Sequence, residues 1–220
     1  PAGAVWVQGT NATMEAGAEI SKMVGRAFYV DGGGAKIGGI IRDITGDKDM
    51  WWGTTGIAIH ARGDSKVTLS NGGQITAIQS ANNENDTAVA TYGSNFTMDQ
   101  GSEIFDLKNI MAIYADDFGN NYTHEMLING TIRDCTTTGV LARSWYGLIT
   151  IGPEGLITKN KASQVLYTHN GSKYTIEGKL LNNTGTALYL ADQGGGRVTA
   201  EMIGDNAEIS GTTGVAVRVN

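Results

Sequence analysis

Two short phrases recur along the whole chain, and this repetition constrains the fold more than any other feature of the sequence. The first phrase is an apolar residue, Thr and an apolar residue, followed by Gly, any residue, and Ile or Leu; a clear copy runs from Val67 to Ile75. The last residues of the eight copies are Ile20, Ile41, Ile75, Ile104, Ile132, Ile157, Leu180 and Ile209. Their spacings are 21, 34, 29, 28, 25, 23 and 29 residues. A period of about 20 to 50 residues is typical of a solenoid.

The second phrase lies between copies of the first. It reads Ala, an apolar residue, a large residue and another apolar residue, as in Ala27-Phe28-Tyr29-Val30. Runs that alternate in this way and are bounded by Gly, Asn and Asp are typical of strands. Sustained helical spacing of apolar residues is absent from the sequence. Each repeat therefore predicts three short strands and little helix.

Three strands per repeat can form one turn of a wide solenoid, in which equivalent strands stack about 4.8 Å apart. With these repeats the chain resembles the right-handed parallel β-helix superfamily, the pectin-lyase-like fold. It is most similar in composition to the Gly-, Asn- and Thr-rich solenoids of bacterial surface proteins. The resemblance implies an all-β, single-stranded parallel β-helix of about eight coils, one for each copy of the first phrase, with three short strands per coil.

The repeat runs through nearly all of the 220 residues, so we expect residues 1–220 to form a single solenoid domain. Both ends of the chain have the pattern of strand interiors, as in Val217-Arg218-Val219 at the end. We therefore expect the chain to be a segment of a larger surface protein, with neighbouring domains of the same polypeptide.

Aligning the Ala phrases predicts which side chains share a column. The residue after Ala is apolar in every copy and is expected to point into the core; the column is Val5, Phe28, Ile59, Val89, Ile113, Leu166, Leu188 and Val217. The next residue must then face the opposite, solvent side. This outward column, here called the ladder, is Trp6, Tyr29, His60, Ala90, Tyr114, Tyr167, Tyr189 and Arg218. The segment Val140–Arg143 fits the series in either of two registers.

The ladder has two main interpretations. Stacked outward aromatics stabilise neighbouring strands by about 0.2–1 kcal/mol per pair. Exposed Tyr, Trp and Arg are also the usual anchors of a surface that binds a glycan or a protein. A third possibility is that a neighbouring domain covers the ladder. A separate column is expected to face out of the second sheet: Thr68, Thr97, Thr150, Thr175 and Thr199. One Thr per coil of varying length does not form the flat array of an ice-binding surface.

Polar insertions interrupt the repeat and could carry function, because solenoid loops are where activity is usually added. The pair Trp51 and Trp52 lies in one insertion and could stack on sugar rings or pack over the next coil. A second insertion contains four candidate catalytic residues: Asp116, Asp117, His124 and Glu125. Such groups can perform acid–base chemistry, but their spacing does not match a calcium loop. The alternative is a solvated polar loop, and we expect no metal site.

Composition limits the classes of partner that the chain could bind. The net charge of −6 argues against nucleic acid or an acidic membrane surface. The sequence has no apolar run of about 18 residues, the length needed to insert into a membrane. The single cysteine, Cys135, precludes an internal disulfide and is expected to be a small buried residue.

The catalytic motifs of the enzymes on this fold are largely missing. Of the polygalacturonase-type motifs only Asp116-Asp117 is present, and no cofactor-binding motif occurs. We therefore expect a non-catalytic, adhesin-like segment that is secreted or attached to the bacterial cell wall, needs no cofactor, and binds a host or plant polysaccharide or a surface glycoprotein. The alternatives are a polysaccharide lyase or glycoside hydrolase of the pectin-lyase-like fold, and a purely structural stalk or spacer.

Overall fold

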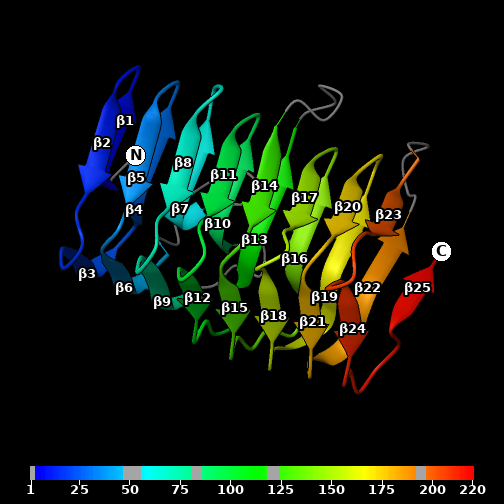
Figure 1. The fold of residues 1–220 in the computed structure, drawn as a ribbon. Helices are drawn as coiled ribbons and strands as arrows, with labels where there is room; N and C mark the ends of the chain where they lie inside the picture. Colours follow the sequence, from blue (N-terminus) through cyan, green and yellow to red (C-terminus); the bar gives the residue numbers. More distant parts are fainter. Residues whose placement is uncertain (1–2, 47–55, 81–85, 118–123, 192–196) are drawn as a thin grey trace.

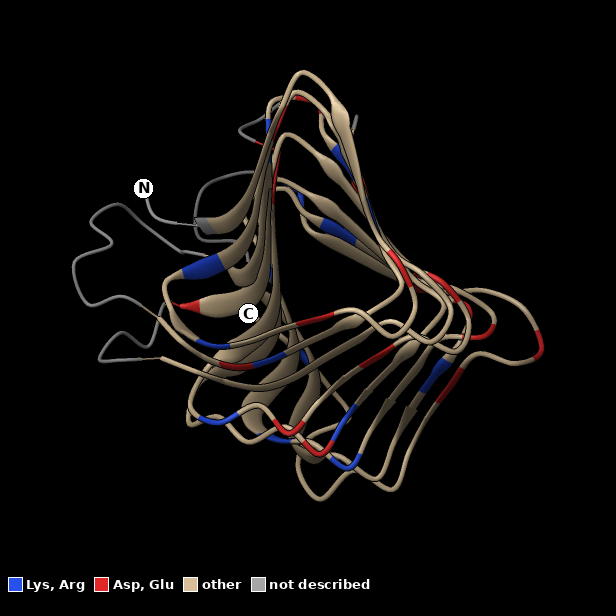
Figure 2. Ribbon diagram, turned by 90° about the vertical axis from the view of Figure 1, so that its left-hand side faces the viewer, with Lys and Arg blue, Asp and Glu red and all other residues tan. Residues whose placement is uncertain are grey.

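The computed structural model describes residues 3–46, 56–80, 86–117, 124–191 and 197–220, and within these ranges every regular element is a strand. The strands form three parallel sheets that run the length of the molecule (Figure 1). Successive strands enter sheet 1, sheet 2 and sheet 3 in turn, so the coils overlap in a three-sided outline when viewed along the solenoid (Figure 2). The predicted all-β parallel solenoid with three strands per coil is confirmed.

Each sheet contains one strand from each of eight coils, and sheet 1 has β25 as a ninth strand. Sheet 1 contains β1 (Gly3–Gln8), β4 (Arg26–Asp31), β7 (Gly56–Arg62), β10 (Thr87–Tyr92), β13 (Met111–Asp116), β16 (Val140–Trp145), β19 (Lys161–His169), β22 (Thr184–Ala191) and β25 (Val217–Val219). Sheet 2 contains β2 (Asn11–Met14), β5 (Gly34–Ile37), β8 (Lys66–Leu69), β11 (Asn95–Met98), β14 (Glu125–Ile128), β17 (Leu148–Ile151), β20 (Lys173–Ile176) and β23 (Thr199–Met202). Sheet 3 contains β3 (Glu19–Val24), β6 (Ile40–Thr45), β9 (Gln74–Gln79), β12 (Glu103–Phe105), β15 (Thr131–Arg133), β18 (Leu156–Thr158), β21 (Lys179–Leu181) and β24 (Glu208–Ser210).

The pairing register confirms the predicted core column of sheet 1. Val5 is paired with Phe28, and Phe28 with Ile59. The same column continues to Leu188 and Val217. Parallel pairing of coils therefore places like apolar side chains above one another along the whole interior, where they form one continuous core.

The register also settles one ambiguity and corrects one assignment. Ile113 is paired with Ala142, so Ala142 belongs to the core column and Arg143 to the ladder. In sheet 2, Thr68 is paired with Thr97 and Thr150 with Thr175, as predicted. Thr199 is wrongly placed in that column, because Thr175 is paired with Glu201. Thr199 is paired with Lys173, two residues before Thr175 on the neighbouring strand, so it stays on the outer face.

Each coil turns sharply inside or just after its sheet 3 strand. The residue two positions after the last residue of each Thr phrase has a φ between 50° and 62°; these residues are Lys22, Asp43, Ala77, Asp106, Asp134, Lys159, Asn182 and Gly211. Asp, Asn and Gly tolerate this left-handed conformation best and hold five of the eight positions. The turn reverses the alternation, so that residues three apart, such as Ile41 and Ile44, are both buried in the core.

The inward corner column changes from apolar to amide side chains along the solenoid. Ile44, Ile78, Leu107 and Cys135 are buried there, and Cys135 is a free cysteine, as predicted. Two buried asparagines then follow. Asn160 Oδ1 accepts from the Cys135 backbone N–H at 3.0 Å, and Asn183 Oδ1 accepts from the Asn160 backbone N–H at 3.0 Å. Asn183 Nδ2 donates to the Ile157 carbonyl at 2.9 Å. These amides replace water as partners of backbone groups that the corner leaves unpaired.

The substitution Asn183→Ala is expected to lower the free energy of unfolding by about 1–3 kcal/mol, because it leaves buried backbone groups without partners. Urea denaturation of the two chains measures the difference. The adjacent Asn182→Gly is the matched control. It should stay within about 0.5 kcal/mol of the parent, since glycine already occupies the equivalent corner position 211. Equal stability of the parent and Asn183→Ala would contradict a structural role for the asparagine pair.

Candidate functional site

The outer face of sheet 1 carries the ladder in the predicted order. Register pairs run Trp6–Tyr29–His60–Ala90 and Ala90–Tyr114–Arg143, and the column then continues to Tyr167, Tyr189 and Arg218. Trp6 and Tyr29 have ring centroids 4.6 Å apart, and Tyr29 and His60 lie 5.3 Å apart with nearly parallel planes. The structure therefore brings together all the described side chains that the sequence placed in this column.

A second outward column, two residues further along each strand, completes the stack. Tyr92 lies beside the gap left by Ala90, with its ring centroid 5.2 Å from His60 and 5.7 Å from Tyr114. The next coil has Asp116 at this position, and the column then continues with Trp145 and His169, whose ring centroids are 4.9 Å apart. These second-column residues lie outside the Ala-phrase alignment, which is why sequence reasoning missed them; their signal is a large side chain two residues after the ladder position.

The rings of the ladder are turned toward their neighbours along the solenoid. Tyr29 and His60 differ in plane by 6°, so the face of each ring is occupied by the other. The Arg143 guanidinium lies 5.1 Å from the centroid of Trp145 and 5.6 Å from that of Tyr167, and Arg218 lies 5.2 Å from that of Tyr189. Stacking between strands and cation–π contacts therefore use ring faces that a sugar would otherwise need.

Exposure varies along the ladder. Tyr29, Ala90 and Tyr114 are only 6%, 0% and 3% exposed, so the expectation that the whole column faces solvent is wrong for these three residues, whereas Trp6 is exposed and His60 is half-buried. Tyr29 is covered by Arg26 and Arg62, each with Cζ 5.6 Å from its ring centroid. In the later coils the side chains remain accessible: Arg143, Trp145, Tyr167 and Tyr189 are half-buried and Arg218 is exposed. We call these five residues the open stripe.

Burial controls the protonation of His60 and Asp86 in the early coils of this face. Burial, followed by the charges of Arg26 and Arg62, lowers the pKa of His60 to about 3. His60 is therefore neutral near physiological pH, and its Nδ1 accepts a weak hydrogen bond from the Gly56 N–H at 3.4 Å. Burial also raises the pKa of Asp86, whose Oδ2 accepts from Ser80 Oγ at 2.6 Å. This half of the face is a packed polar–aromatic layer.

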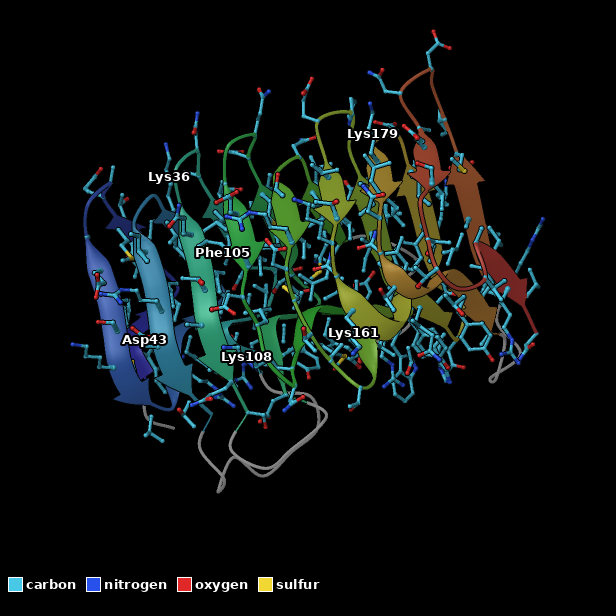
Figure 3. All side chains as sticks on the ribbon, turned by 90° about the horizontal axis from the view of Figure 1, so that it is seen from below. Lys36, Asp43, Phe105, Lys108, Lys161 and Lys179 are labelled. Carbon is cyan, nitrogen blue, oxygen red and sulfur yellow. The ribbon has the colours of Figure 1, made fainter. Side chains whose placement is uncertain are left out.

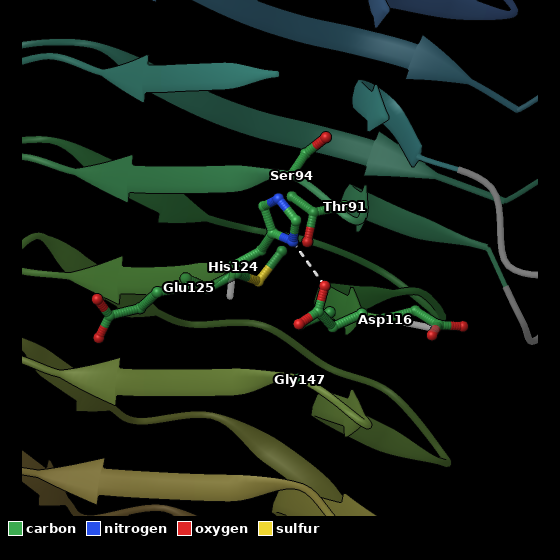
Figure 4. A pocket seen from close by; sticks show the side chains of 9 residues that line it. Thr91, Ser94, Asp116, His124, Glu125 and Gly147 are labelled. Carbon is green, nitrogen blue, oxygen red and sulfur yellow. Dashed lines mark hydrogen bonds and ion pairs between the residues drawn. The ribbon is translucent and has the colours of Figure 1, made fainter. Parts of the chain in front are cut away.

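The corner between sheets 1 and 2 brings a histidine between two carboxylates. His124, which is labelled in Figure 4, has its Nδ1 2.6 Å from Asp117 Oδ1. Its Nε2 lies 2.7 Å from Asp64 Oδ1. Asp117 is buried with 1% of its side chain exposed, His124 has 13% exposed, and Asp64 is at the surface. The ring lies next to Gly93, where an added Cβ would be 3.9 Å from His124 Cε1. One imidazole thus connects corners of three successive coils.

Of the four candidate catalytic residues, Asp117 and His124 are paired through their side chains. Asp116 Oδ2 accepts from the Tyr114 hydroxyl at 3.1 Å. The Glu125 carboxylate points away from His124, while its backbone N–H donates to Asn95 Oδ1 at 3.0 Å (Figure 4). Asp64, the third member of the cluster, lies 60 residues before His124, and local spacing could not have identified it.

Burial alone would lower the pKa of His124, but the hydrogen bonds to Asp117 and Asp64 outweigh it and raise the pKa. Both ring nitrogens are engaged, so a proton transfer to a substrate would require one of these bonds to break. The shallow depression beside the ring is lined by residues including Thr91, Ser94 and Met126. Asp117, His124 and Asp64 therefore link successive coils through charged hydrogen bonds, and we call this cluster the ionic clamp.

Further predictions from the sequence concern Trp51 and Trp52, metal binding and membrane insertion. Trp51 and Trp52 lie outside the described residues. Among residues that the structure describes, no three His, Cys, Asp or Glu side chains are grouped to hold a metal ion. In the same ranges no helix has the length and apolar character to cross a membrane. Comparison of the chain with protein-family models, curated protein sequences and solved structures gave no match.

The substitution His124→Gln is expected to destabilise the fold by about 1 kcal/mol in a pH-dependent way. The folded pKa of His124 is raised, so the contribution is fully present below the unfolded pKa of about 6.5 and is lost as pH rises through the folded pKa. Denaturation at pH 5.5 and 8.5, chosen to lie about one unit or more on either side of that unfolded value, measures this difference.

His60→Gln is the matched comparison, because the folded pKa of His60 is lowered to about 3. At pH 5.5 only the unfolded parent protonates this residue, so the cost of His60→Gln should be smaller at pH 5.5 than at pH 8.5, the opposite of the trend for His124→Gln. A cost for His124→Gln that is independent of pH would contradict the ionic clamp.

Proposed function

We propose that the chain is a non-catalytic β-helix segment that presents a binding surface outside a bacterial cell, in the manner of an adhesin. The observation that carries this proposal is the open stripe, a continuous set of half-buried and exposed aromatic and arginine side chains on sheet 1. Aromatic and arginine side chains on a rigid face are typical anchors of binding surfaces. Its support on parallel strands keeps the spacing of these side chains fixed.

The chemistry of the open stripe favours an anionic glycan. Arg143 and Arg218 bring positive charge to its two ends, and Arg143 Nε is buried without a hydrogen-bond partner among the described residues. The ring faces are largely occupied, so the ligand would contact ring edges, tyrosine hydroxyls and guanidinium groups rather than stack on the rings. Carboxylate or sulfate groups on an extended polysaccharide match this arrangement.

The places of the insertions in the sequence also support sheet 1 as the binding face. Segments 47–55 and 81–85 precede strands of sheet 1, and segments 118–123 and 192–196 follow strands of sheet 1. All four are therefore adjacent in the sequence to strands of the sheet that bears the ladder, and Trp51 and Trp52 belong to one of them. Loops that extend from a solenoid are a frequent location of binding residues.

A polysaccharide-cleaving enzyme is the second candidate, and the Asp117–His124 contact is the observation that favours it. A carboxylate–histidine pair can serve acid–base chemistry once a ring nitrogen is released. Release of unsaturated or reducing-end sugars from uronate polymers, lost in His124→Gln, would favour the enzyme over the binding module. A stalk is the third candidate and predicts neither capture nor cleavage.

The double substitution Tyr167→Ser and Tyr189→Ser is expected to weaken capture of an anionic polysaccharide such as polygalacturonate by at least about tenfold, because two central contacts are lost. Affinity electrophoresis with the polysaccharide in the gel measures the change. Adding Arg143→Gln to the double variant should weaken capture further and make capture less dependent on salt concentration.

Phe105→Ser is the matched control. Phe105 is also an outward aromatic under an arginine, with Arg133 Cζ 4.4 Å from its ring centroid, but it lies on sheet 3 (Figure 3). This variant should keep full capture. Loss of capture in the control, or unchanged capture in the double variant with only lower stability, would contradict the proposed binding surface.

A further inference from the structure

Arg26 carries a positive charge that no described residue neutralises by direct contact. It is the first residue of β4 on sheet 1, and it is half-buried. Its Nε is buried without a hydrogen-bond partner, and within the described ranges its side chain forms no hydrogen bond or ion pair. A guanidinium stays charged at physiological pH. Folding therefore leaves a partly desolvated charge uncompensated, which is unfavourable.

Arg133 on sheet 3 shows how a fully partnered arginine of this solenoid is held. It donates to both carboxylate oxygens of Glu103, at 3.0 and 3.2 Å, and to Asp134 Oδ2 at 2.8 Å. Its Cζ also lies 4.4 Å from the ring centroid of Phe105. An arginine over an aromatic ring can thus have carboxylate partners as well, and Arg26 differs from Arg133 in lacking them.

A second guanidinium lies beside the same aromatic ring as Arg26. The Cζ atoms of Arg26 and Arg62 each lie 5.6 Å from the ring centroid of Tyr29. Arg62 donates from Nε and Nη2 to a single carboxylate oxygen, Asp31 Oδ2, at 3.1 and 2.9 Å. Two positive charges therefore adjoin one ring, and among the described residues only one carboxylate is bonded to either of them.

The titratable groups around Arg26 do not supply the missing negative charge. Burial, followed by the charges of Arg26 and Arg62, lowers the pKa of His60 to about 3, so this ring is neutral. Burial raises the pKa of Asp86, whose Oδ2 accepts from Ser80 Oγ at 2.6 Å. Asp86 acts on Arg26 only through space, because no hydrogen bond or ion pair joins the two side chains. The charge of Arg26 is therefore open to a ligand.

We propose that Arg26 binds an oxyanion group, a carboxylate or a sulfate, and that the charge of Arg62 strengthens the attraction. The terminal nitrogens of Arg26 donate to two oxygens of the group, a geometry to which the planar guanidinium is suited. The Tyr29 ring lies between Trp6 and His60, with centroids 4.6 and 5.3 Å away. The site therefore takes the charged group alone, since a sugar or an aromatic ligand has no face of Tyr29 on which to stack.

The oxyanion site is separate from the open stripe and does not depend on it. Arg26 lies in β4, the second strand of sheet 1, and Arg143 lies in β16, the sixth. Four steps of about 4.8 Å place the two arginines about 19 Å apart along the solenoid. The oxyanion could be a free anion or a group carried on a polysaccharide. Binding at Arg26 is expected in either case, even if the open stripe captures nothing.

A sulfate titration followed by nuclear magnetic resonance tests the proposal. Chloride keeps the ionic strength constant. The Nε–Hε resonance of Arg26, assigned by its loss in Arg26→Lys, is expected to shift in a saturable way, because a sulfate on the terminal nitrogens changes the environment of the whole guanidinium. The resonance of Arg133, whose donors already have carboxylate partners, is the internal control and should not shift. No saturable shift at Arg26, or equal shifts at both arginines, would overturn the proposal.

Variants measure what each charge contributes, with the backbone amide resonance of Tyr29 as the readout. Arg26→Gln should weaken sulfate binding by at least about tenfold. Arg26→Lys keeps the charge but loses the planar pair of donors, so its affinity should be intermediate, and it serves as the test if Arg26→Gln does not fold. Asp86→Asn removes a nearby negative charge and should strengthen binding by about two- to fivefold.

Arg133→Gln is the matched control and should bind sulfate as the parent does. Unchanged affinity in both Arg26 variants, or binding lost in the control, would contradict the assignment.

Competition against sulfate identifies the source of the oxyanion. If oligogalacturonate displaces sulfate from Arg26 at a concentration at least about tenfold below that of acetate, the group is one carried on a polysaccharide. If the two act at equal concentrations of carboxylate, the site takes small free anions. Either result supports an oxyanion site at Arg26.

Discussion

The structure depends on the parallel pairing of each coil with the next in a fixed register. A coil alone has too little apolar surface to fold, and it becomes stable only when its inward side chains lie against those of its neighbours. The pairing of Val5 with Phe28 and of Phe28 with Ile59 shows this alignment in the first three coils. The same alignment creates the outer columns. A surface feature of one coil is therefore repeated by the next coil and becomes a stripe.

Features that repeat in every coil could be predicted from the sequence, because their signal is summed over eight copies of the phrase. Features set by a single contact could not. The register of Val140–Arg143 depended on pairing with β13, and the place of Thr199 depended on the pairing of β23 with β20. The burial of Tyr29 depends on Arg26 and Arg62, whose positions over its ring are tertiary.

The outer face of sheet 1 illustrates how one column can have two roles. In the early coils its rings and arginines cover one another, and burial keeps His60 neutral, so the column stabilises the sheet. In the later coils the same pattern leaves tyrosine edges and guanidinium groups accessible. The sequence predicted the ladder residues but missed Trp145, and only the structure separated the buried members from those that remain accessible. Asp64 belongs to the His124 cluster only because the fold places it next to His124, and no spacing in the sequence indicates that contact.

The central claim, that the coils stack in this register, is tested most directly by a disulfide between two coils. Thr68 and Thr97 are register partners on the outer face of sheet 2, and strands about 4.8 Å apart meet the geometry of a disulfide. Oxidation of a chain with Thr68→Cys and Thr97→Cys should give a quantitative crosslink while the buried Cys135 stays reduced. A chain with Thr68→Cys and Asn95→Cys, displaced by two residues, should remain uncrosslinked. Crosslinking of the displaced pair, or of neither pair, would contradict the stacked coils.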